Sequence, residues 1–366
     1  MLGFLAYSII FLTGLGLVVL DILALIAYAR YKKTSRLRPD IAILVPALNE
    51  ERVISNCIDS LLALNYPKGK KHIFVVDNGS MDKTREICSE YERKGLITLI
   101  KNKKKTSKAE GLNKAIEGLD FELFAIIDAD CIASSGWLSD AVNHMSKKTG
   151  VVGAALRASN RTENWLTRAA ACEVYLVYEL LRAACYGLTK TTVFSGAGFV
   201  IKKECWKDLN GFDENVLNED TIFAFELAKK RWKVGFSKER IYQELPNSLG
   251  EIIDQRTRWL IGDFQMLKGS KTAGIMLSYF FWVLPLLFVL LSPIFPTLLL
   301  LPLLFLFFFF LGALILGHPV SGIFTAVFFI FPLNFALLLR AAFSTIKGHN
   351  HQRRSPERSG KVTAKL

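Results

Sequence analysis

Two aspartates separated by one residue, Asp128 and Asp130, follow an apolar run of the kind that forms a buried strand. Such a pair suits a hard divalent cation, because Mg²⁺ and Mn²⁺ are commonly held by one or two carboxylates together with substrate phosphates and water. The same spacing also occurs in a simple capping turn. The pair therefore indicates a Mg²⁺ or Mn²⁺ site only in combination with other residues.

Further polar residues stand where predicted strands end or predicted helices begin. Lys108 opens a helical stretch, where its ammonium group and the first backbone amides would bind an anion. Asp77 ends a strand and could present acceptors to a base or ribose, although a plain turn between strand and helix explains it nearly as well. Asp220 stands at the start of a helical run. It is either a simple N-cap or a chemically active carboxylate. A third polar turn, after an apolar run at 41–45, contains Pro46, Asn49 and Glu50.

Residues 195–199 read Ser-Gly-Ala-Gly-Phe, which is part of a dinucleotide-binding fingerprint. Ile201 occupies the position of the third glycine, so that interpretation is poor. The small residues instead predict that a ligand approaches the backbone closely.

The most specific pattern is Gln255, Arg258 and Trp259, which share one face of a helix at spacings of three and four residues. Arginine gives forked hydrogen bonds to a diphosphate, and an indole gives a sugar an apolar stacking surface. Apolar residues on the opposite side predict packing on a core or a bilayer surface. The predicted apolar stripe consists of Ile253, Leu260, Phe264 and Leu267.

Short strand-like and helical segments alternate from residue 40 to residue 127. This alternation predicts an α/β fold with a Rossmann-like, mostly parallel sheet. Ligands of such sheets bind beyond the carboxyl ends of the strands, where the three polar turns stand. The predicted strands are 41–45, 72–76, 97–100 and 124–127, and the predicted helices are 53–64, 83–90 and 108–117.

The chain has 366 residues, of which 51% are hydrophobic, and the apolar residues are concentrated at its two ends. Each end is long enough to supply membrane spans of about 20 apolar residues. Prolines and glycine interrupt the second end, so the number of its crossings stays open between two and four. The expected organisation is an N-terminal transmembrane helix (1–30), a cytosolic domain (38–248), an interfacial helix (249–270), C-terminal transmembrane helices (272–345) and a basic tail (346–366).

The formal net charge is +13, and much of the excess lies beside the hydrophobic ends. Basic residues flanking a span orient it with that side in the cytosol, so the central domain is predicted to be cytoplasmic on a cell membrane. The charge is compatible with nucleic acid, anionic lipid or a phosphorylated small molecule. The predicted spans favour membrane lipids and the small molecule, with no nucleic acid partner. None of the six cysteines forms a Cys-x-x-Cys pair or has a histidine at zinc-ligand spacing, which indicates reduced thiols.

The ordered set of motifs from 45–51 to 255–259 resembles the family 2 glycosyltransferases. More narrowly, it resembles the membrane synthases of cellulose, hyaluronan, chitin and poly-N-acetylglucosamine. The resemblance covers residues 40–268 and implies a GT-A fold. It also implies inverting transfer from a nucleoside diphosphate sugar, usually a UDP-sugar, with Mg²⁺ or Mn²⁺ as cofactor.

The resemblance also implies roles for individual residues. Asp220 corresponds to the general base, Asp130 to the metal ligand, and Asp128 to a ribose or diphosphate contact that can share the metal. Trp259 and Glu219 correspond to the acceptor side. The remaining donor-binding positions are Pro46, Asn49, Glu50, Asp77, Lys108, Gln255 and Arg258. Asn78 and Asn218 depart from residues common in the family, which weakens any inference about the particular sugar.

Three functions remain in competition at this point. The first is transfer to a growing polysaccharide at the cytosolic membrane face, which the pattern of Gln255, Arg258 and Trp259 favours. The second is transfer of a single sugar to a lipid such as ceramide or a polyprenyl phosphate, which shares nearly every motif. The third is nucleotide binding without transfer, against which the retention of all the acidic positions argues.

Overall fold

The structure is a computed structural model, and the described residues fall into two compact units. The sheet unit lies within Lys32–Asn160 and Lys190–Glu244, and the helical unit lies within Arg161–Thr189 and Leu245–Arg353. The described residues are 38–102, 104–175, 191–192, 194–216 and 218–267, with the isolated residues 19, 22, 23, 26, 179, 182 and 186; only the backbone is described for 261–267.

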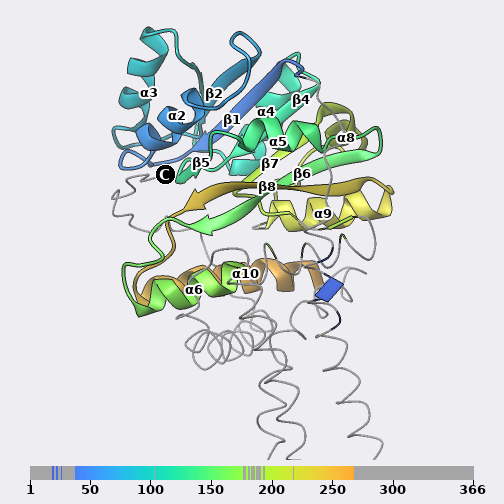
Figure 1. The fold of residues 1–366 in the computed structure, drawn as a ribbon. Coiled ribbons are helices and arrows are strands. Elements are labelled where there is room, and N and C mark those ends of the chain that lie inside the picture. The colour runs from blue at the N-terminus through green and yellow to red at the C-terminus, as the bar shows by residue number, and fades with distance from the viewer. Residues whose placement is uncertain are drawn as a thin grey trace, which may run out of the picture. The chain divides into compact units, whose positions relative to one another are not determined.

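Strands and helices alternate through the first part of the sheet unit, as predicted (Figure 1). β2 lies between β1 and β3, and β4 lies on the other side of β1, with all these neighbours parallel. The carboxyl ends of these strands therefore share one edge of the sheet. The elements are β1 (Ile41–Ala47), α2 (Ile54–Leu62), β2 (Lys71–Asp77), α3 (Thr84–Arg93), β3 (Thr98–Lys101), α4 (Lys108–Gly118) and β4 (Leu123–Ile127).

Two strands of the second part run against the others and make the sheet mixed, while the remaining six run in one direction, so the expectation of a mostly parallel sheet is confirmed. The strand order is β3-β2-β1-β4-β7-β6-β8-β5, and β7 runs antiparallel to both β4 and β6. Apolar periodicity reveals a strand but not its direction, which is why the sequence did not show the reversal. The elements are β5 (Cys131–Ala133), α5 (Trp137–Asn143), β6 (Thr149–Ala158), β7 (Gly198–Lys202), α8 (Lys203–Asp208), α9 (Glu219–Lys229) and β8 (Lys233–Gln243).

Both faces of the central strands are buried. On one face, Leu44 of β1 and Phe124 of β4 pack with Leu112 of α4 and Phe223 of α9. The alternate residues of β1 point to the other face, where they are also inaccessible to solvent. Sheets with two covered faces read as continuous apolar runs, which explains the composition of these strands.

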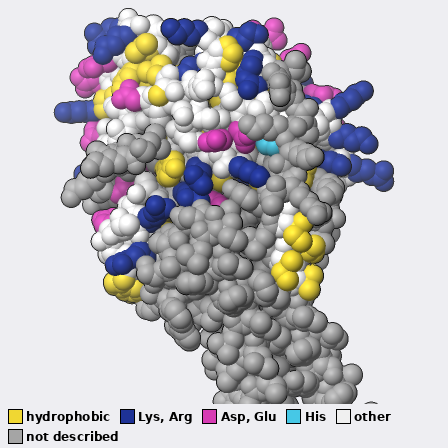
Figure 2. Space-filling view, in the orientation of Figure 1, with side chains coloured by type: hydrophobic (Ala, Val, Ile, Leu, Met, Phe, Trp, Pro, Cys, Tyr) yellow, Lys and Arg dark blue, Asp and Glu magenta, His cyan; other side chains and the backbone are white. Residues whose placement is uncertain are grey.

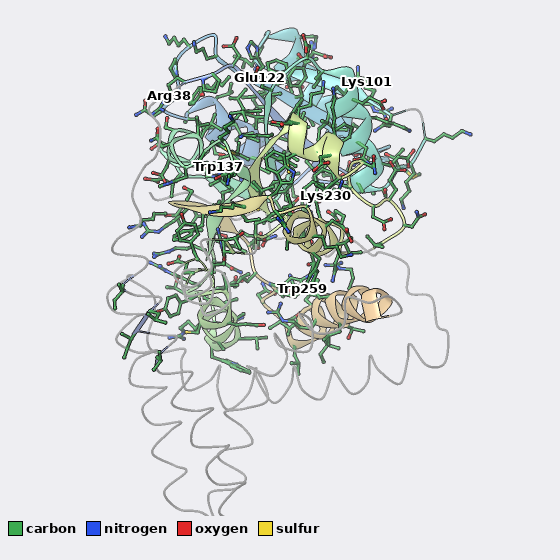
Figure 3. The ribbon with its side chains drawn as sticks, turned by 90° about the vertical axis from the view of Figure 1, so that its right-hand side faces the viewer. Arg38, Lys101, Glu122, Trp137, Lys230 and Trp259 are labelled. Carbon is green, nitrogen blue, oxygen red and sulfur yellow. The ribbon has the colours of Figure 1, made fainter. Side chains whose placement is uncertain are left out.

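The labelled residues of Figure 3 illustrate the contrast between the interior and the edge of the sheet unit. Trp137 of α5 has no exposed surface, whereas Lys101 and Lys230 are exposed to solvent. Figure 2 shows Lys and Arg side chains spread over one face of the molecule among acidic ones. The positive charge of the described surface on that face is therefore dispersed.

The side chain of Lys71 caps the C-terminal end of α2. Its Nζ donates hydrogen bonds to the carbonyl oxygens of Leu61 (3.0 Å), Leu62 (2.6 Å) and Leu64 (3.0 Å). These carbonyls lie at or just beyond the helix end, where no further turn of helix follows; those of Leu61 and Leu64 also accept backbone amides, at 3.3 Å and 2.9 Å. A cation at this position also interacts favourably with the helix dipole.

We expect Lys71→Met to lower the free energy of unfolding by about 1–3 kcal/mol, because hydrogen bonds to a charged donor are lost at partly buried acceptors. Thermal unfolding followed by circular dichroism measures the change. Lys70→Met is the matched control, since Nζ of this exposed neighbour has one hydrogen bond, to the carbonyl of Arg38. Equal melting temperatures for the two variants would contradict this assignment.

The helical unit contains α6 (Trp165–Tyr175) and α10 (Leu249–Leu267), which lie side by side (Figure 1). Asn164 precedes α6 and accepts hydrogen bonds from the backbone amides of Leu166 and Thr167, both at 2.9 Å, so it caps the helix start. Its amide also donates to the carbonyl of Asn247 just before α10. This hydrogen bond links the segments that precede the two helices.

Within the described part of the chain, no helix combines the length and the apolar character needed to cross a membrane. The spans predicted in 1–30 and 272–345 and the basic tail 346–366 lie outside the described residues, apart from isolated positions in the first span.

Candidate active site

Lys108 joins two acidic segments that are far apart in the sequence. It is the first residue of α4, and Ser107 before it caps the helix by accepting a hydrogen bond from the amide of Glu110. Lys108 Nζ lies 2.6 Å from Asp128 Oδ1 and 3.3 Å from Glu219 Oε1. It also donates to the carbonyl of Gly196 at 3.1 Å. The predicted anion-binding lysine therefore has carboxylates as its direct partners.

These contacts determine the protonation state of Lys108. Burial by itself lowers the pKa of this amine, since the charged form loses water. The carboxylates of Asp128 and Glu219 outweigh burial and hold the pKa above its ordinary value. Lys108 is therefore a permanent cation at physiological pH.

Asp220 lies in the first turn of α9, beyond the N-cap residue Asn218. Its Oδ2 accepts a hydrogen bond from the backbone amide of Gly196 at 2.6 Å, and its Oδ1 accepts one from the amide of Thr221 at 2.8 Å. A Cβ atom on Gly196 would come within 2.8 Å of Asp220 Oδ2. The small residue at 196 thus leaves room for the carboxylate of Asp220.

The pKa of Asp220 is raised to about 6. Burial is the main cause, and the neighbouring charge of Glu219 adds to it. Lys108 and the two backbone amides act in the opposite direction by stabilising the carboxylate. A carboxylate with this raised pKa is ionised at neutral pH while still able to accept a proton.

Asp130 lies two residues after Asp128, in the turn between β4 and β5. Its Oδ2 accepts a hydrogen bond from Gln243 Nε2 at 3.0 Å, and its Oδ1 is 3.4 Å from the thiol of Cys131. Its side chain is buried, whereas that of Asp128 is 28% exposed. Gln243 ends β8, and nothing in the sequence marked it, because it lies 113 positions from Asp130.

Asp77 ends β2 and is completely buried. Its Oδ2 contacts both Nε (2.6 Å) and Nη2 (2.5 Å) of Arg85, and its Oδ1 accepts from the amide of Ser80 at 2.9 Å. Arg85 lies on α3 and was not predicted as a site residue. An arginine eight residues after an aspartate, near the start of the next helix, is the pattern that could have shown it.

The polar turn after β1 is joined to the turn after β2. Asn49 adopts a φ of 58°, donates its amide to Ser80 Oγ and accepts from the amide of Met81 through Oδ1. The amide of Glu50 donates to Thr84 Oγ1 at 2.7 Å. Pro46 differs from these residues, since it is a buried member of β1 paired with Val76. Its predicted part in donor binding is therefore at most through the backbone.

Gln255, Arg258 and Trp259 lie on α10 of the helical unit and are partly exposed. The buried stripe of this helix is Ile252, Arg256 and Leu260. Of the predicted apolar stripe, Leu260 is buried and Ile253 is partly exposed, while the side chains at 264 and 267 lie outside the description. The prediction is thus confirmed at Leu260 and wrong at Ile253, beside which Ile252 and the arginine at 256 are the buried residues.

The oxygen donors of Asp128 and Asp130 suit Mg²⁺ or Mn²⁺ in chemical type. Within the described ranges, no three His, Cys, Asp or Glu side chains are grouped so that they could hold a metal ion by themselves. One oxygen of Asp128 is already paired with Lys108. The residues therefore fit a cation that takes most of its ligands from phosphate and water, and they do not fit a metal bound by the protein alone.

The arrangement of strands and acidic turns is that of a GT-A-like α/β domain. The chain matches the family model described as "Glycosyltransferase like family 2" over residues 39–262, well over half of its length. The chain therefore belongs to this family of glycosyltransferases.

Several known proteins are similar to the chain. The beta-monoglucosyldiacylglycerol synthase of Nostoc sp. is 28% identical over 274 residues, which cover 71% of this chain and 57% of that protein. The poly-beta-1,6-N-acetyl-D-glucosamine synthase of Staphylococcus epidermidis is 23% identical over 62% of this chain and 55% of that protein. The chain thus spans a little over half the length of these curated relatives.

Among solved structures, the mannosyltransferase PcManGT from Pyrobaculum calidifontis, in complex with GDP-Man and Mn²⁺, has a TM-score of 0.63. The similarity covers 93% of this chain and 97% of that chain, at 19% sequence identity. This likeness supports the GT-A-like fold.

Proposed function

We propose that the chain transfers a sugar from a nucleoside diphosphate sugar, such as a UDP-sugar, to a hydroxyl acceptor with inversion at the anomeric carbon. The observation that carries the proposal is the cluster in which Asp220, with its pKa of about 6, stands beside the cation of Lys108 and the acidic turn of Asp128. A base with this pKa is matched to neutral pH. The family membership supplies the reaction class.

In the proposed reaction, Asp220 takes the proton of the acceptor hydroxyl while that oxygen forms a bond to the anomeric carbon. The bond from this carbon to the diphosphate oxygen breaks at the same time, and the diphosphate leaves with the electron pair. Lys108 and Arg258 offer cationic donors for the negative charge that develops on it. Asp77 and the turn with Asn49 and Glu50 bind the nucleoside part of the donor. Gln255 contacts the donor diphosphate, and Glu219 and Trp259 border the acceptor.

A Mg²⁺ or Mn²⁺ ion held by Asp130 and Asp128 would act as a Lewis acid on the diphosphate. Because these residues offer few protein ligands, we expect Mn²⁺ to bind weakly to the nucleotide-free protein and at least about tenfold more tightly with UDP present. Electron paramagnetic resonance of free Mn²⁺ measures both affinities. Asp130→Asn should abolish the difference, whereas Asp120→Asn, an exposed aspartate after α4, should preserve it. Tight binding without nucleotide would contradict the proposed site.

For the acceptor, we propose a growing polysaccharide at the cytosolic face of the membrane. The residues that support this acceptor are Gln255, Arg258 and Trp259, and a relative named as a poly-beta-1,6-N-acetyl-D-glucosamine synthase agrees with it. The predicted spans and the membrane location belong to the same proposal.

A lipid acceptor is the second candidate. The specific observation in its favour is the 28% identity to a protein named beta-monoglucosyldiacylglycerol synthase, which exceeds the 23% identity to the polysaccharide synthase. In that case one sugar is added to each lipid.

One experiment tests the reaction and separates the two acceptors. Membranes containing the full chain are incubated with UDP-glucose, UDP-N-acetylglucosamine or GDP-mannose, with Mn²⁺ or Mg²⁺ and with or without a chelator. Release of nucleotide together with a glycosylated product, lost on chelation, supports the proposed function. A ladder of oligomers identifies the polysaccharide, and a single lipid-soluble product identifies the lipid. Absence of any product with all three donors would overturn the proposal.

A further inference from the structure

Arg256 is a buried arginine within the segment that carries Gln255, Arg258 and Trp259. Only 4% of its surface is exposed, and it lies between Ile252 and Leu260 on the buried stripe of α10. A cation at such a position requires a partner, because an unpaired buried charge costs several kcal/mol. The partner is Glu173 of α6, of which 5% is exposed.

The guanidinium group of Arg256 makes three contacts at once. Its Nη2 lies 2.5 Å from Glu173 Oε2, and its Nη1 donates to Gln255 Oε1 at 3.2 Å. Its Cζ lies 4.3 Å from the centroid of the Trp259 ring. Two nitrogens of the guanidinium thus bind the carboxylate and the amide, while its central carbon lies over the indole ring.

The geometry of arginine makes these contacts interdependent. A guanidinium is a rigid plane with donors in fixed directions, so a carboxylate bound at its edge fixes the orientation of its face. A desolvated cation against an indole is attracted more strongly than one at an exposed site. The position of Glu173 on α6 therefore determines where the guanidinium group lies over the Trp259 ring.

Stability alone gives little reason for this arrangement. Burying both members of an ion pair costs about as much as their attraction returns, so an apolar pair of similar volume would stabilise the two helices as well or better. On its own helix Arg256 contacts Gln255 and Trp259. These are the residues proposed to contact the donor and to border the acceptor. Orientation of these residues is an effect that an apolar pair would not provide.

We propose that Arg256, oriented by Glu173, is a positioning residue that holds the Trp259 indole in place for acceptor binding. The effect on the acceptor rests on the proposed function, in which Trp259 borders the acceptor sugar. The effect on the ring itself does not depend on any activity.

The test uses the full chain with the double variant Arg256→Met/Glu173→Gln. Both charges are removed, so no unpaired charge is buried and the fold should persist with a melting temperature close to that of the unchanged protein. Tryptophans are labelled with 5-fluorotryptophan, and the ¹⁹F resonance of Trp259 is identified by its disappearance in Trp259→Phe. We expect the Trp259 resonance to shift and broaden in the double variant. The resonance of Trp165, on α6 near Asn164, is the internal control and should stay unchanged.

The kinetic readout uses N-acetylglucosamine oligomers and diacylglycerol in phosphatidylcholine vesicles as acceptor probes. In the double variant the KM for the acceptor should rise about five- to tenfold, while the KM for the nucleotide sugar stays within about twofold. An unmoved Trp259 resonance with an unchanged acceptor KM would overturn the inference. If the double variant does not fold, Arg256→Lys decides in the same way, since it keeps a cation beside Glu173 but has no planar face.

The two readouts separate this inference from the proposed function. If the unchanged protein transfers no sugar, the proposed function fails, and the Trp259 resonance still reports whether Arg256 positions the ring. If transfer occurs and neither the resonance nor the acceptor KM changes in the double variant, the positioning role fails while the proposed function stands.

Discussion

Replacing Asp220 with asparagine should lower the turnover number by about 10²–10⁴-fold, the usual contribution of a positioned general base. Asparagine has nearly the same shape but accepts no proton at neutral pH. The affinity for UDP should change little, since the direct partners of Asp220 are the amides of Gly196 and Thr221. Steady-state kinetics and calorimetric UDP binding measure the two effects.

The pH dependence of the reaction offers a second test of Asp220. Its pKa of about 6 predicts that kcat/KM falls about tenfold per pH unit below pH 6, as the carboxylate becomes protonated in the free enzyme. This acid limb should be absent from the residual activity of Asp220→Asn. A limb of unchanged position in that variant would assign the titration to another group.

Loss of stability cannot account for the expected effect of Asp220→Asn. The folded-state pKa of Asp220 lies above its ordinary value of 3.8, so ionisation of this group opposes folding. The penalty appears as the pH rises from 3.8 towards 6 and is fully present at pH 7. A neutral asparagine avoids it and gives up at most one backbone hydrogen bond.

Glu226→Gln is a matched control for Asp220→Asn. It removes a carboxylate from the same helix, α9, at a partly exposed position beside Lys229. Its turnover should remain within about twofold of the unchanged protein, since surface ion pairs contribute little. Full activity of Asp220→Asn, with this control also active, would refute the proposed base.

The first half of the sheet could be predicted because each element carries its own local signal. The strands are continuous apolar runs, and the helices between them have one apolar face, as α2 shows with Ile54, Cys57, Ile58 and Leu61. The direction of β7 had no such signal. β7 pairs with β4 and β6, and its direction between these two strands is decided by tertiary packing.

The candidate site divides in a similar way. Asp128, Asp220 and Lys108 were recognised by residue type and by position at the ends of elements. Their mutual pairing was not, because the sequence cannot show that an ammonium group turns towards two carboxylates instead of towards a phosphate. Contacts of this kind join residues about 20 or 111 positions apart and leave no periodic pattern.

Arg256 shows the limit of reasoning from periodicity. The predicted apolar stripe of α10 included Leu260, which is buried, but it contained Ile253 and omitted Arg256, which is buried with Ile252 on the same face. Arginine is rarely buried without a partner. The partner, Glu173, lies on α6, a helix for which the sequence gave no functional signal. A buried charge can be read from a sequence only when both members of the pair are recognised.

Lys108→Met should have the second largest effect, on both stability and catalysis. The side chains of Lys108 and Glu219 are only 12% and 10% exposed, so removing the cation leaves Glu219 and Asp128 without their counter-ion in a poorly solvated place. We expect a loss of about 3 kcal/mol of stability, at the lower end of the range for a broken buried pair because Asp128 is partly solvated. The raised pKa of Lys108 means that its stabilising effect is fully present below the ordinary value of 10.5 and is lost only in more alkaline solution. The loss should nevertheless be larger at pH 8 than at pH 6, because Asp220 becomes ionised over this range and its carboxylate is also stabilised by Lys108.

The catalytic consequence of Lys108→Met follows from its effect on Asp220. Lys108 is one of the groups that lower the pKa of that carboxylate, so its removal should move the acid limb of kcat/KM to higher pH. The maximal kcat/KM should fall by about 10²-fold, since a cationic donor for the leaving diphosphate is also lost. Lys108→Arg should restore part of the stability and return the limb towards pH 6. Lys114→Met removes a 58% exposed lysine from the same helix, where it pairs with Glu110, and should change neither quantity appreciably. If the acid limb stays in place in Lys108→Met while the stability falls, Lys108 is a structural counter-ion of Asp128 and Glu219 without influence on the proposed base.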